Sequence, residues 1–140
     1  DGKNVRDWLF VEDHAKAIDM VQEQGRLFET YNVGGHNEKQ NIEIINIIID
    51  TLQEMLPADD PRRALVSKDL ITYVEDRKGH DRRYAIAPDK IKAEIGWYPE
   101  TDFATGIKKT IAWFFEHEDW MKNVTSGDYQ KYYDDMYANK

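Results

Sequence analysis

The spacing of hydrophobic and polar positions changes several times along the chain, and each change predicts a new element of secondary structure. Val5 to Val11 is a short run rich in apolar residues and predicts a strand, with Arg6 on one of its faces. From Glu12 the spacing becomes helical, Asp13 can cap the first turn, and Gly25 suits the end of the helix. The face of this helix that packs inward is predicted at Ala15, Ile18 and either Val21 or Gln22.

The next segments repeat this order of strand and helix. Thr30 to Val33 is rich in residues that favour strands, and Gly34-Gly35 predicts a tight turn that uses backbone angles closed to other residues. Asn41 to Leu56 predicts a long helix, with Asn41 as its cap and Glu43 in its first turn. The apolar stripe of this helix is predicted at Ile45, Ile48, Leu52 and Met55.

The second half of the chain is less regular. Pro57 to Asp69 has little periodicity and predicts an exposed connection, whereas Ile71 to Val74 predicts another strand. Pro88 and Gly96 bracket a short helix. A longer helix is predicted at Phe103, Ile107, Ile111 and Phe114, after a cap at Thr101 or Asp102. Residues 123–140 are ambiguous between a helix and an extended arm.

Together these elements predict an α/β (α+β) fold, a small mixed domain of short strands and several packed helices. The 140 residues are 41% hydrophobic and 33% charged, which is the composition of an ordinary folded domain. We therefore expect residues 1–140 to form a single domain. Because the sequence starts abruptly at Asp1 without a methionine, we also expect it to be cut from a longer protein.

Charge and cysteine content narrow the possible partners. The 19 Lys and Arg residues against 27 Asp and Glu residues give a net charge of -8, which repels nucleic acid. The longest apolar run, within Asn41 to Asp50, is too short and too interrupted to cross a bilayer. The absence of cysteine fits a reducing compartment, so we expect the cytoplasm.

Motifs for catalysis by this chain alone are missing from the sequence. Gly34-Gly35 lies between a predicted strand and helix but lacks the further glycine spacing of a dinucleotide-binding turn. The four histidines are widely separated, so no metal site is predicted. A nucleophile elbow and a phosphate-binding P-loop are also absent.

One segment has the composition of an anion-binding loop. Between Asp76 and Tyr84, four basic side chains and a histidine surround Gly79. Arginine suits this task because its planar group donates two parallel hydrogen bonds to a phosphate, and glycine lets the chain bend close to a ligand. The charge pattern alone fits a salt-bridged surface loop equally well.

Three stretches resemble extended short-chain dehydrogenases that act on nucleotide sugars. The stretch from Asp1 to Ala15, D-G-K-N-V-R-D-W-L-F-V-E-D-H-A, also fits epimerases of that family. Y-N-V-G-G-H-N-E from Tyr31 and D-R-K-G-H-D-R-R-Y-A-I from Asp76 narrow the resemblance to the dTDP-glucose 4,6-dehydratases. The resemblance continues into the tail and covers nearly all of the chain.

The resemblance implies the C-terminal, nucleotide-sugar-binding domain of such an enzyme. In that family an N-terminal Rossmann domain binds NAD and carries a Tyr-x-x-x-Lys pair with the acid and base that eliminate water, and these motifs are missing from this sequence. NAD is therefore expected on the missing domain, no catalytic residue is expected here, and the chain alone is expected to be inactive. The family's substrate-binding positions fall on Arg6, Asn41, Asp76, Arg77, Gly79, His80 and Tyr137.

The sequence differs from the family pattern at two places. Lys78 stands where the family usually has proline, and the connection at 57–69 is longer than usual.

The resemblance also implies a reaction for the whole enzyme. The enzyme would form dTDP-4-keto-6-deoxy-glucose by oxidation at C4 of dTDP-glucose, loss of water across C5 and C6, and return of the hydride to C6. Its implied partners are the nucleotide sugar, the N-terminal Rossmann domain of the same protein and a second copy in a homodimer.

Two alternatives stay open at this point. The chain could be the substrate domain of another nucleotide-sugar epimerase, dehydratase or decarboxylase, or a packing module without enzymatic function. If the chain is this substrate-binding domain, Arg77, His80 and Tyr137 are expected to converge on one anion-accepting pocket, although Tyr137 lies far along the chain from the other two.

Overall fold

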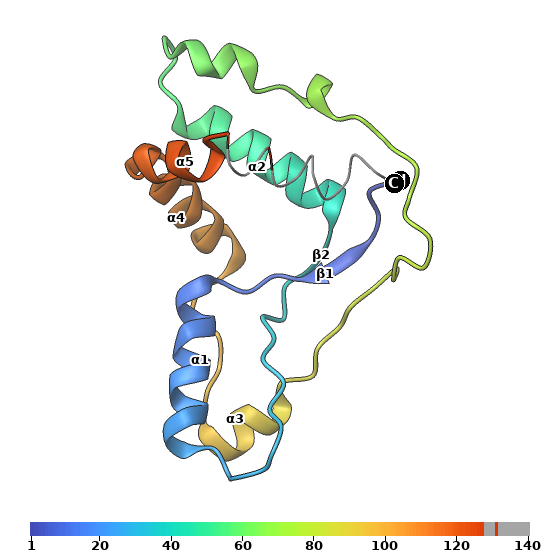
Figure 1. Cartoon of the computed structure of the whole chain (residues 1–140), viewed down its shortest axis with the longest axis vertical. Helices are drawn as coiled ribbons and strands as arrows, with labels where there is room; N and C mark the ends of the chain where they lie inside the picture. The colour runs from blue at the N-terminus through green and yellow to red at the C-terminus, as the bar shows by residue number, and fades with distance from the viewer. Residues whose placement is uncertain (128–130, 132–140) are drawn as a thin grey trace. The chain divides into compact units, whose positions relative to one another are not determined.

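The computed structural model describes residues 1–127 and 131 (Figure 1). The chain divides into two compact units, Asp1–Ile107 and Lys108–Lys140, which are described separately. The fold class predicted from the sequence, a small mixed domain of short strands and several helices, is confirmed. None of the described helices is long and apolar enough to cross a membrane.

The first unit is organised around a short strand that is paired on both sides. β1 (Val5–Asp7) pairs antiparallel with β2 (Glu38–Gln40), and Arg6 lies opposite Lys39. On the other side of β1, the N–H of Val5 donates to the carbonyl of Arg82 at 2.8 Å, and the N–H of Tyr84 donates to the carbonyl of Val5 at 3.1 Å. Residues 82–84 are therefore held beside β1 although they are far away in sequence.

The predicted strands are only partly confirmed. The strand predicted from Val5 to Val11 covers only Val5–Asp7, and Val11 is already the first residue of the first helix. Thr30 to Val33 and Ile71 to Val74 form no strand. Tyr31 and Val33 nevertheless pack against the core. The strand-favouring composition of this segment therefore reflects burial of these side chains rather than strand pairing.

Gly34 and Gly35 are required for a reason that the sequence prediction missed. Neither has a positive φ, so the turn predicted to need special backbone angles is wrong. Instead, a Cβ atom on Gly34 would lie 2.7 Å from the carboxylate of Asp7, and one on Gly35 would lie 2.3 Å from the carbonyl of Trp8. The absent side chains let this loop approach β1, where Asp7 accepts the N–H of Gly35 at 2.7 Å.

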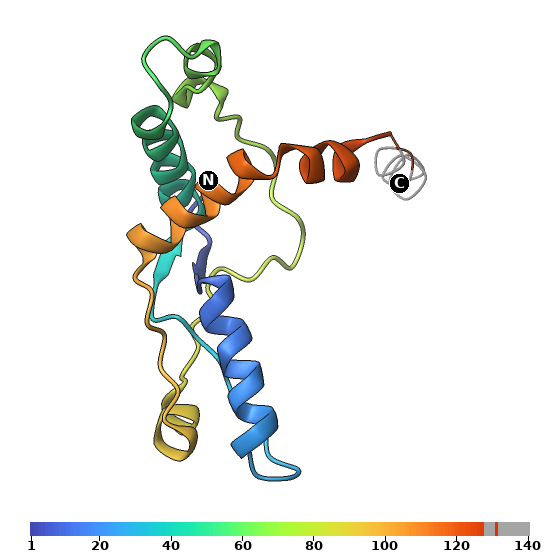
Figure 2. The ribbon, with the colours of Figure 1, turned by 90° about the vertical axis from the view of Figure 1, so that its left-hand side faces the viewer.

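Helices α1 (Val11–Gln24) and α3 (Asp89–Ile95) lie side by side and build the core (Figures 1 and 2). The buried cluster consists of Ala17, Ile91, Ile95 and Trp97. The predicted end of α1 at Gly25 is confirmed, but its predicted apolar face is only partly right: Val21 packs against the core, whereas Ile18 is 57% exposed. The predicted start and end of α3 are confirmed, and Gly96 closes it at φ 77°.

Asp13 does not cap α1 as predicted but ties the helix to the segment after α3. Phe10 occupies the cap position, with no side-chain hydrogen bond. The buried carboxylate of Asp13 accepts the N–H of Thr101 at 2.9 Å, and its carbonyl accepts the indole N–H of Trp97 at 3.1 Å. A buried carboxylate is tolerated because it has these partners.

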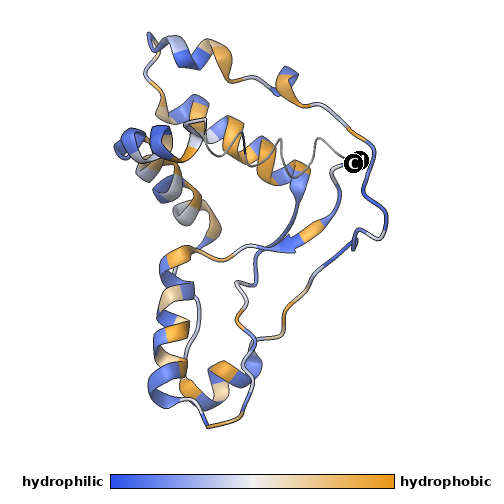
Figure 3. Ribbon diagram, in the orientation of Figure 1, coloured by the Kyte–Doolittle hydropathy of each residue, from blue (hydrophilic) through white to orange (hydrophobic). Residues whose placement is uncertain are grey.

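The prediction of a long helix after β2 is confirmed as α2 (Asn41–Met55). Its cap is Gln40 rather than Asn41: the Gln40 side chain and that of Glu43 form a reciprocal capping box. Figure 3 shows hydrophobic residues along most of α2. The buried positions are Ile44 and Thr51, one residue before the predicted stripe.

The connection after α2 is more ordered than the sequence suggests. It contains two short 3-10 helices, η1 (Pro61–Leu65) and η2 (Lys68–Leu70). The amide of Gln53 on α2 donates to the carbonyl of Arg63 at 2.9 Å and to that of Val66, which fixes the connection to the helix.

α4 (Phe103–Glu116) begins in the first unit and continues into the second, where α5 (Glu118–Thr125) follows it. Asp102 is the cap of α4, as one of the two predictions had it, since its carboxylate accepts the N–H of Thr105 at 2.9 Å. In the second unit the Trp113 ring stacks on His117 with centroids 4.2 Å apart and meets Trp120 edge-on.

A substitution in the loop after α1 is expected to stabilise the protein. Phe28 has φ 65° and is fully exposed, so its side chain packs on nothing while its backbone is strained. We expect Phe28→Gly to raise the free energy of unfolding by up to about 1 kcal/mol, because relief of strain exceeds the added chain entropy. Urea unfolding measures this, and Leu27→Gly, at an exposed neighbour without positive φ, should lower it. A lower midpoint for Phe28→Gly would contradict the prediction.

A polar cluster at the end of α3 is expected to make stability depend on pH. The hydroxyl of Tyr31 donates to Glu94 at 2.8 Å and Arg26 pairs with the same carboxylate at 2.6 Å, so the pKa of Glu94 lies below its ordinary value of 4.5. Because the pKa of Glu94 is lower in the folded protein than in the unfolded one, its ionised form stabilises the fold at a pH above the unfolded pKa. This stabilisation is lost as the pH falls from the unfolded pKa through the folded pKa. Urea midpoints at pH 7 and pH 4 should therefore differ less for Glu94→Gln than for the unaltered protein.

Candidate substrate-binding site

A network of polar side chains joins β1 to the loop that follows the 3-10 helices. The pairing of Val5 with residues 82–84 sets the register and brings Arg6 beside His80. The Nη2 atom of Arg6 lies 2.8 Å from Nε2 of His80, and Nδ1 of His80 lies 2.6 Å from the carboxylate of Asp76. Residues far apart in sequence therefore meet in one hydrogen-bonded chain.

The hydrogen-bond partners of His80 assign the tautomer of its neutral ring. A guanidinium only donates and a carboxylate only accepts, so the neutral ring carries its proton on Nδ1 and accepts at Nε2. Asn4 lies 3.4 Å from the same Nδ1, but both groups are then donors, and its amide instead donates to the carbonyl of Asp81 at 3.3 Å. The hydrogen bond from His80 lowers the pKa of Asp76, which keeps this carboxylate ionised.

Arg6 is held on several sides. Nη1 donates to the carbonyl of Val5 at 2.6 Å and Nη2 donates to the carbonyl of Asp81 at 3.1 Å. The guanidinium carbon lies 4.3 Å from the centre of the Tyr84 ring, which is the geometry of a cation–π contact. The hydroxyl of Tyr84 donates to the carboxylate of Asp81, and this carboxylate raises the pKa of the phenol.

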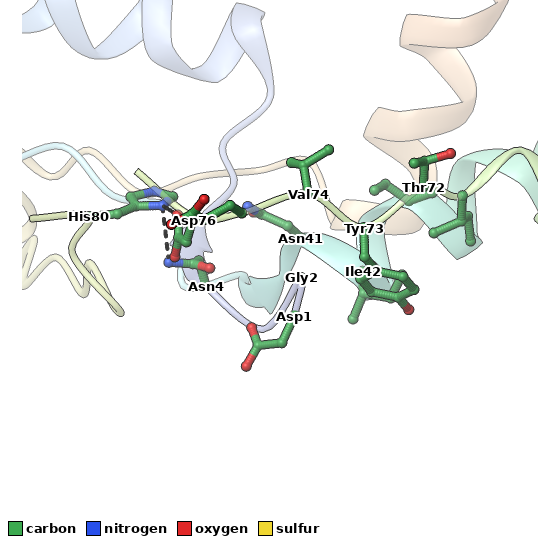
Figure 4. Close-up of a pocket in the computed structure, with 13 residues that line it drawn as sticks. Asp1, Gly2, Asn4, Asn41, Ile42, Thr72, Tyr73, Val74, Asp76 and His80 are labelled. Atoms are coloured by element: carbon green, nitrogen blue, oxygen red, sulfur yellow. Dashed lines mark hydrogen bonds and ion pairs between the residues drawn. The ribbon is translucent and has the colours of Figure 1, made fainter. Parts of the chain in front are cut away.

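A cavity of about 240 Å³ opens next to this network (Figure 4). The figure shows Asn4, Asp76 and His80 grouped at one end of the cavity, and Ile42 and Tyr73 at the other. Asn41 lies between them at the start of α2. The cavity therefore offers polar groups at one end and an apolar wall at the other, as binding sites for small molecules commonly do.

The structure brings together four of the residues predicted to bind substrate. Asn41, Asp76 and His80 line the cavity, and Arg6 is bonded to His80. Gly79 forms an exposed turn at φ 73°, and a Cβ atom there would meet nothing within 4 Å. The roles of all five residues in binding substrate remain predictions.

The structure does not place the other two predicted positions, Arg77 and Tyr137, in the cavity lining. Arg77 is exposed, and its carbonyl accepts the N–H of His80 at 3.3 Å. Tyr137 lies outside the described residues, so its predicted convergence with Arg77 and His80 stays a prediction.

Some of the basic side chains in the predicted anion-binding loop at 76–84 already have acidic partners. Arg82 pairs with Asp1 at 2.9 Å, and Arg83 pairs with Glu38, so two of the four basic side chains in this loop are engaged in ion pairs.

In residues 1–127 and 131 no three carboxylate or histidine side chains gather as metal ligands.

Sequence reasoning missed Asn4, Asp81 and Tyr84 as parts of the site. Asn4 is only 5% exposed, which is unusual for an asparagine, and burial of this kind is invisible in the sequence. The available signal was Tyr84, an aromatic side chain at the end of a basic segment, because arginine commonly stacks on such rings.

Comparison of the sequence with known proteins assigns the chain to a family. The family profile of GDP-mannose 4,6 dehydratase matches residues 1–110. The chain belongs to this family. It is 48% identical to a dTDP-glucose 4,6-dehydratase of Shigella flexneri over 99% of the chain, but it spans only 37% of the length of that relative. The resemblance to dTDP-glucose 4,6-dehydratases is thus confirmed.

Solved structures agree with this relationship. A dTDP-glucose 4,6-dehydratase from Bacillus anthracis in complex with NAD aligns with a TM-score of 0.74 at 44% identity, over 89% of this chain and 36% of that one. A second, from Streptomyces venezuelae with NAD and TYD bound, aligns with a TM-score of 0.73 at 36% identity, over 86% of this chain and 34% of that one. Both relatives hold NAD, and the present chain corresponds to 36% and 34% of their lengths.

The assignment of His80 can be tested directly. Asp76 and Arg6 both favour a proton on Nδ1, one by accepting from it and the other by donating to Nε2. We expect nitrogen NMR of the ring at pH 7.5 to show the neutral Nδ1–H form. Asp76→Ala and Arg6→Ala should each keep the Nδ1–H tautomer in excess over the Nε2–H tautomer, by about tenfold or more. The double variant should lose this excess. An Nε2–H ring in the unaltered protein would refute the assignment, and His80→Gln identifies the signals.

Proposed function

We propose that this chain is the nucleotide-sugar-binding part of a dTDP-glucose 4,6-dehydratase. The observation that carries the proposal is the cavity that unites Asn41, Asp76 and His80, with Arg6 bonded to its polar end. These side chains come from three separate segments of a chain that is 48% identical to a dTDP-glucose 4,6-dehydratase. A diphosphate at the polar end and the less polar parts of the ligand along the apolar wall match this division of the cavity.

Arg6 supplies the cation for an anionic ligand, although the chain has a net charge of -8 and the cavity lining itself contains the carboxylates of Asp1, Glu75 and Asp76. Arg6 has five N–H donors. Within residues 1–127 and 131, its hydrogen bonds go to neutral acceptors, the carbonyls of Val5 and Asp81 and the ring of His80. In this part of the chain no carboxylate is hydrogen-bonded to the guanidinium. A diphosphate oxygen gains a charge-assisted hydrogen bond by taking the place of one of these neutral partners.

The remaining parts of the activity belong to the rest of the proposed enzyme. NAD binding, the acid and base for the loss of water, and the hydride transfer from C4 and back to C6 are assigned to an N-terminal Rossmann domain outside this sequence. This chain contributes affinity and orientation, because binding of the remote diphosphate holds the hexose against the nicotinamide. A homodimer and a cytoplasmic location are part of the same proposal.

The proposal predicts the effect of removing Arg6. In the full-length protein, Arg6→Ala should weaken dTDP binding by about 10- to 100-fold, because a charge-assisted contact contributes roughly 1.5 to 3 kcal/mol. Thymidine, which lacks the diphosphate, should bind the variant and the unaltered protein alike. Titration calorimetry measures both affinities.

A matched control removes a cation elsewhere. Arg26→Ala deletes an arginine that pairs with Glu94, away from the cavity lining, and should leave dTDP affinity unchanged. If Arg6→Ala lowered thermal stability and left dTDP affinity unchanged, Arg6 would be structural and the proposal would lose its central residue.

A second candidate function comes from the family profile itself. Because residues 1–110 match the profile of GDP-mannose 4,6 dehydratase, a related enzyme acting on another nucleotide sugar is the competing assignment. Binding of dTDP and GDP to the full-length protein separates the two, since the proposal expects dTDP to bind more tightly. Failure of both to bind would favour a packing module without a ligand.

A further inference from the structure

We propose that Tyr84 is a positioning residue, which keeps the guanidinium of Arg6 in place and available to the diphosphate. The inference rests on the proposed function, because it assumes that Arg6 meets an anionic ligand. It assigns a role to two residues that contact Arg6 but do not line the cavity, Tyr84 through its ring and Asp81 through its backbone carbonyl.

The backbone fixes Tyr84 relative to Arg6. The N–H of Tyr84 donates to the carbonyl of Val5, the residue before Arg6, at 3.1 Å. The ring is therefore anchored to the strand that carries the arginine, and it lies 4.3 Å from the guanidinium carbon. Stacking of this kind uses the face of the guanidinium and leaves its N–H edges for hydrogen bonds.

The hydroxyl of Tyr84 has a separate effect on charge. Asp81 offers Arg6 only its backbone carbonyl, at 3.1 Å, while its carboxylate accepts the hydroxyl of Tyr84. A carboxylate this near would otherwise compete with a diphosphate for the guanidinium, since ionised partners form the stronger hydrogen bonds. Tyr84 thus holds the local anion on its own hydroxyl and leaves Arg6 with neutral partners, which a ligand can displace.

Two substitutions separate the ring from the hydroxyl. In the full-length protein, Tyr84→Leu removes both, and we expect dTDP affinity to fall about three- to tenfold. Tyr84→Phe keeps the ring but frees the carboxylate of Asp81, and we expect a loss of similar size. The second substitution Asp81→Asn in the Tyr84→Phe protein should restore most of the affinity, because the competing charge is gone.

A double-mutant cycle shows whether Tyr84 acts through Arg6. In an Arg6→Ala background, Tyr84→Leu should have no further effect on dTDP affinity, and thymidine affinity should stay unchanged throughout. Tyr98→Leu is a matched control, because Tyr98 is exposed to the same degree as Tyr84 and has Lys92 over its ring at 4.5 Å, yet it does not line the cavity. This control should leave dTDP affinity unchanged.

The outcomes distinguish this inference from the proposed function. If Arg6→Ala weakens dTDP binding and Tyr84→Leu does not, only the role of Tyr84 is wrong. An equal loss from Tyr84→Leu with and without Arg6, or no rescue by Asp81→Asn, shows a general structural effect and also overturns the role. If the unaltered protein binds no dTDP, the proposed function fails, and this inference fails with it.

Discussion

The candidate site depends on the backbone pairing of β1 on both of its edges. Val5 donates to Arg82 and accepts from Tyr84, while the opposite edge of the strand pairs with β2. This double pairing holds a long loop against the strand without a helix or a larger sheet. Since Arg6 follows Val5, the same hydrogen bonds that fix the strand also decide which loop residues surround its side chain.

Close backbone approach makes this arrangement possible. A side chain at Gly34 or Gly35 would collide with β1 or the residue that follows it, and the carboxylate of Asp7 accepts N–H groups from the loop at Gly35 and Asn37. β2 comes directly after this loop, and α2 comes directly after β2. The start of α2, where Asn41 lines the cavity, is therefore positioned by hydrogen bonds and small residues instead of a large hydrophobic core.

The site also shows how an acidic chain can accept an anion. The carboxylates near Arg6 are occupied by other donors, Asp76 by His80 and Asp81 by Tyr84. Arg6 itself is satisfied by carbonyl groups and a neutral imidazole, which are weaker partners than a phosphate. Local hydrogen bonding thus matters more for binding than the net charge of the whole chain.

The sequence by itself determined where the main helices lie, and its motifs determined the resemblance to a family. α2, α3 and the start of α4 follow from signals a few residues apart: an apolar repeat, Gly96 after α3 and Asp102 before α4. The sequence also determined that residues 76–84 form a basic loop around a glycine. Contacts within one helical turn are local, so the pattern reports them directly.

Only the tertiary structure decided which polar groups meet. Strand pairing, the burial of Asn4, the ion pairs that occupy Arg82 and Arg83, and the contact between Arg6 and Tyr84 all join positions separated by long stretches of chain. The segments 30–33 and 71–74 have strand-like composition but form no strand, because a strand requires a partner and composition names none. Pairing between distant segments is set by the packing of the whole unit, which no local pattern encodes.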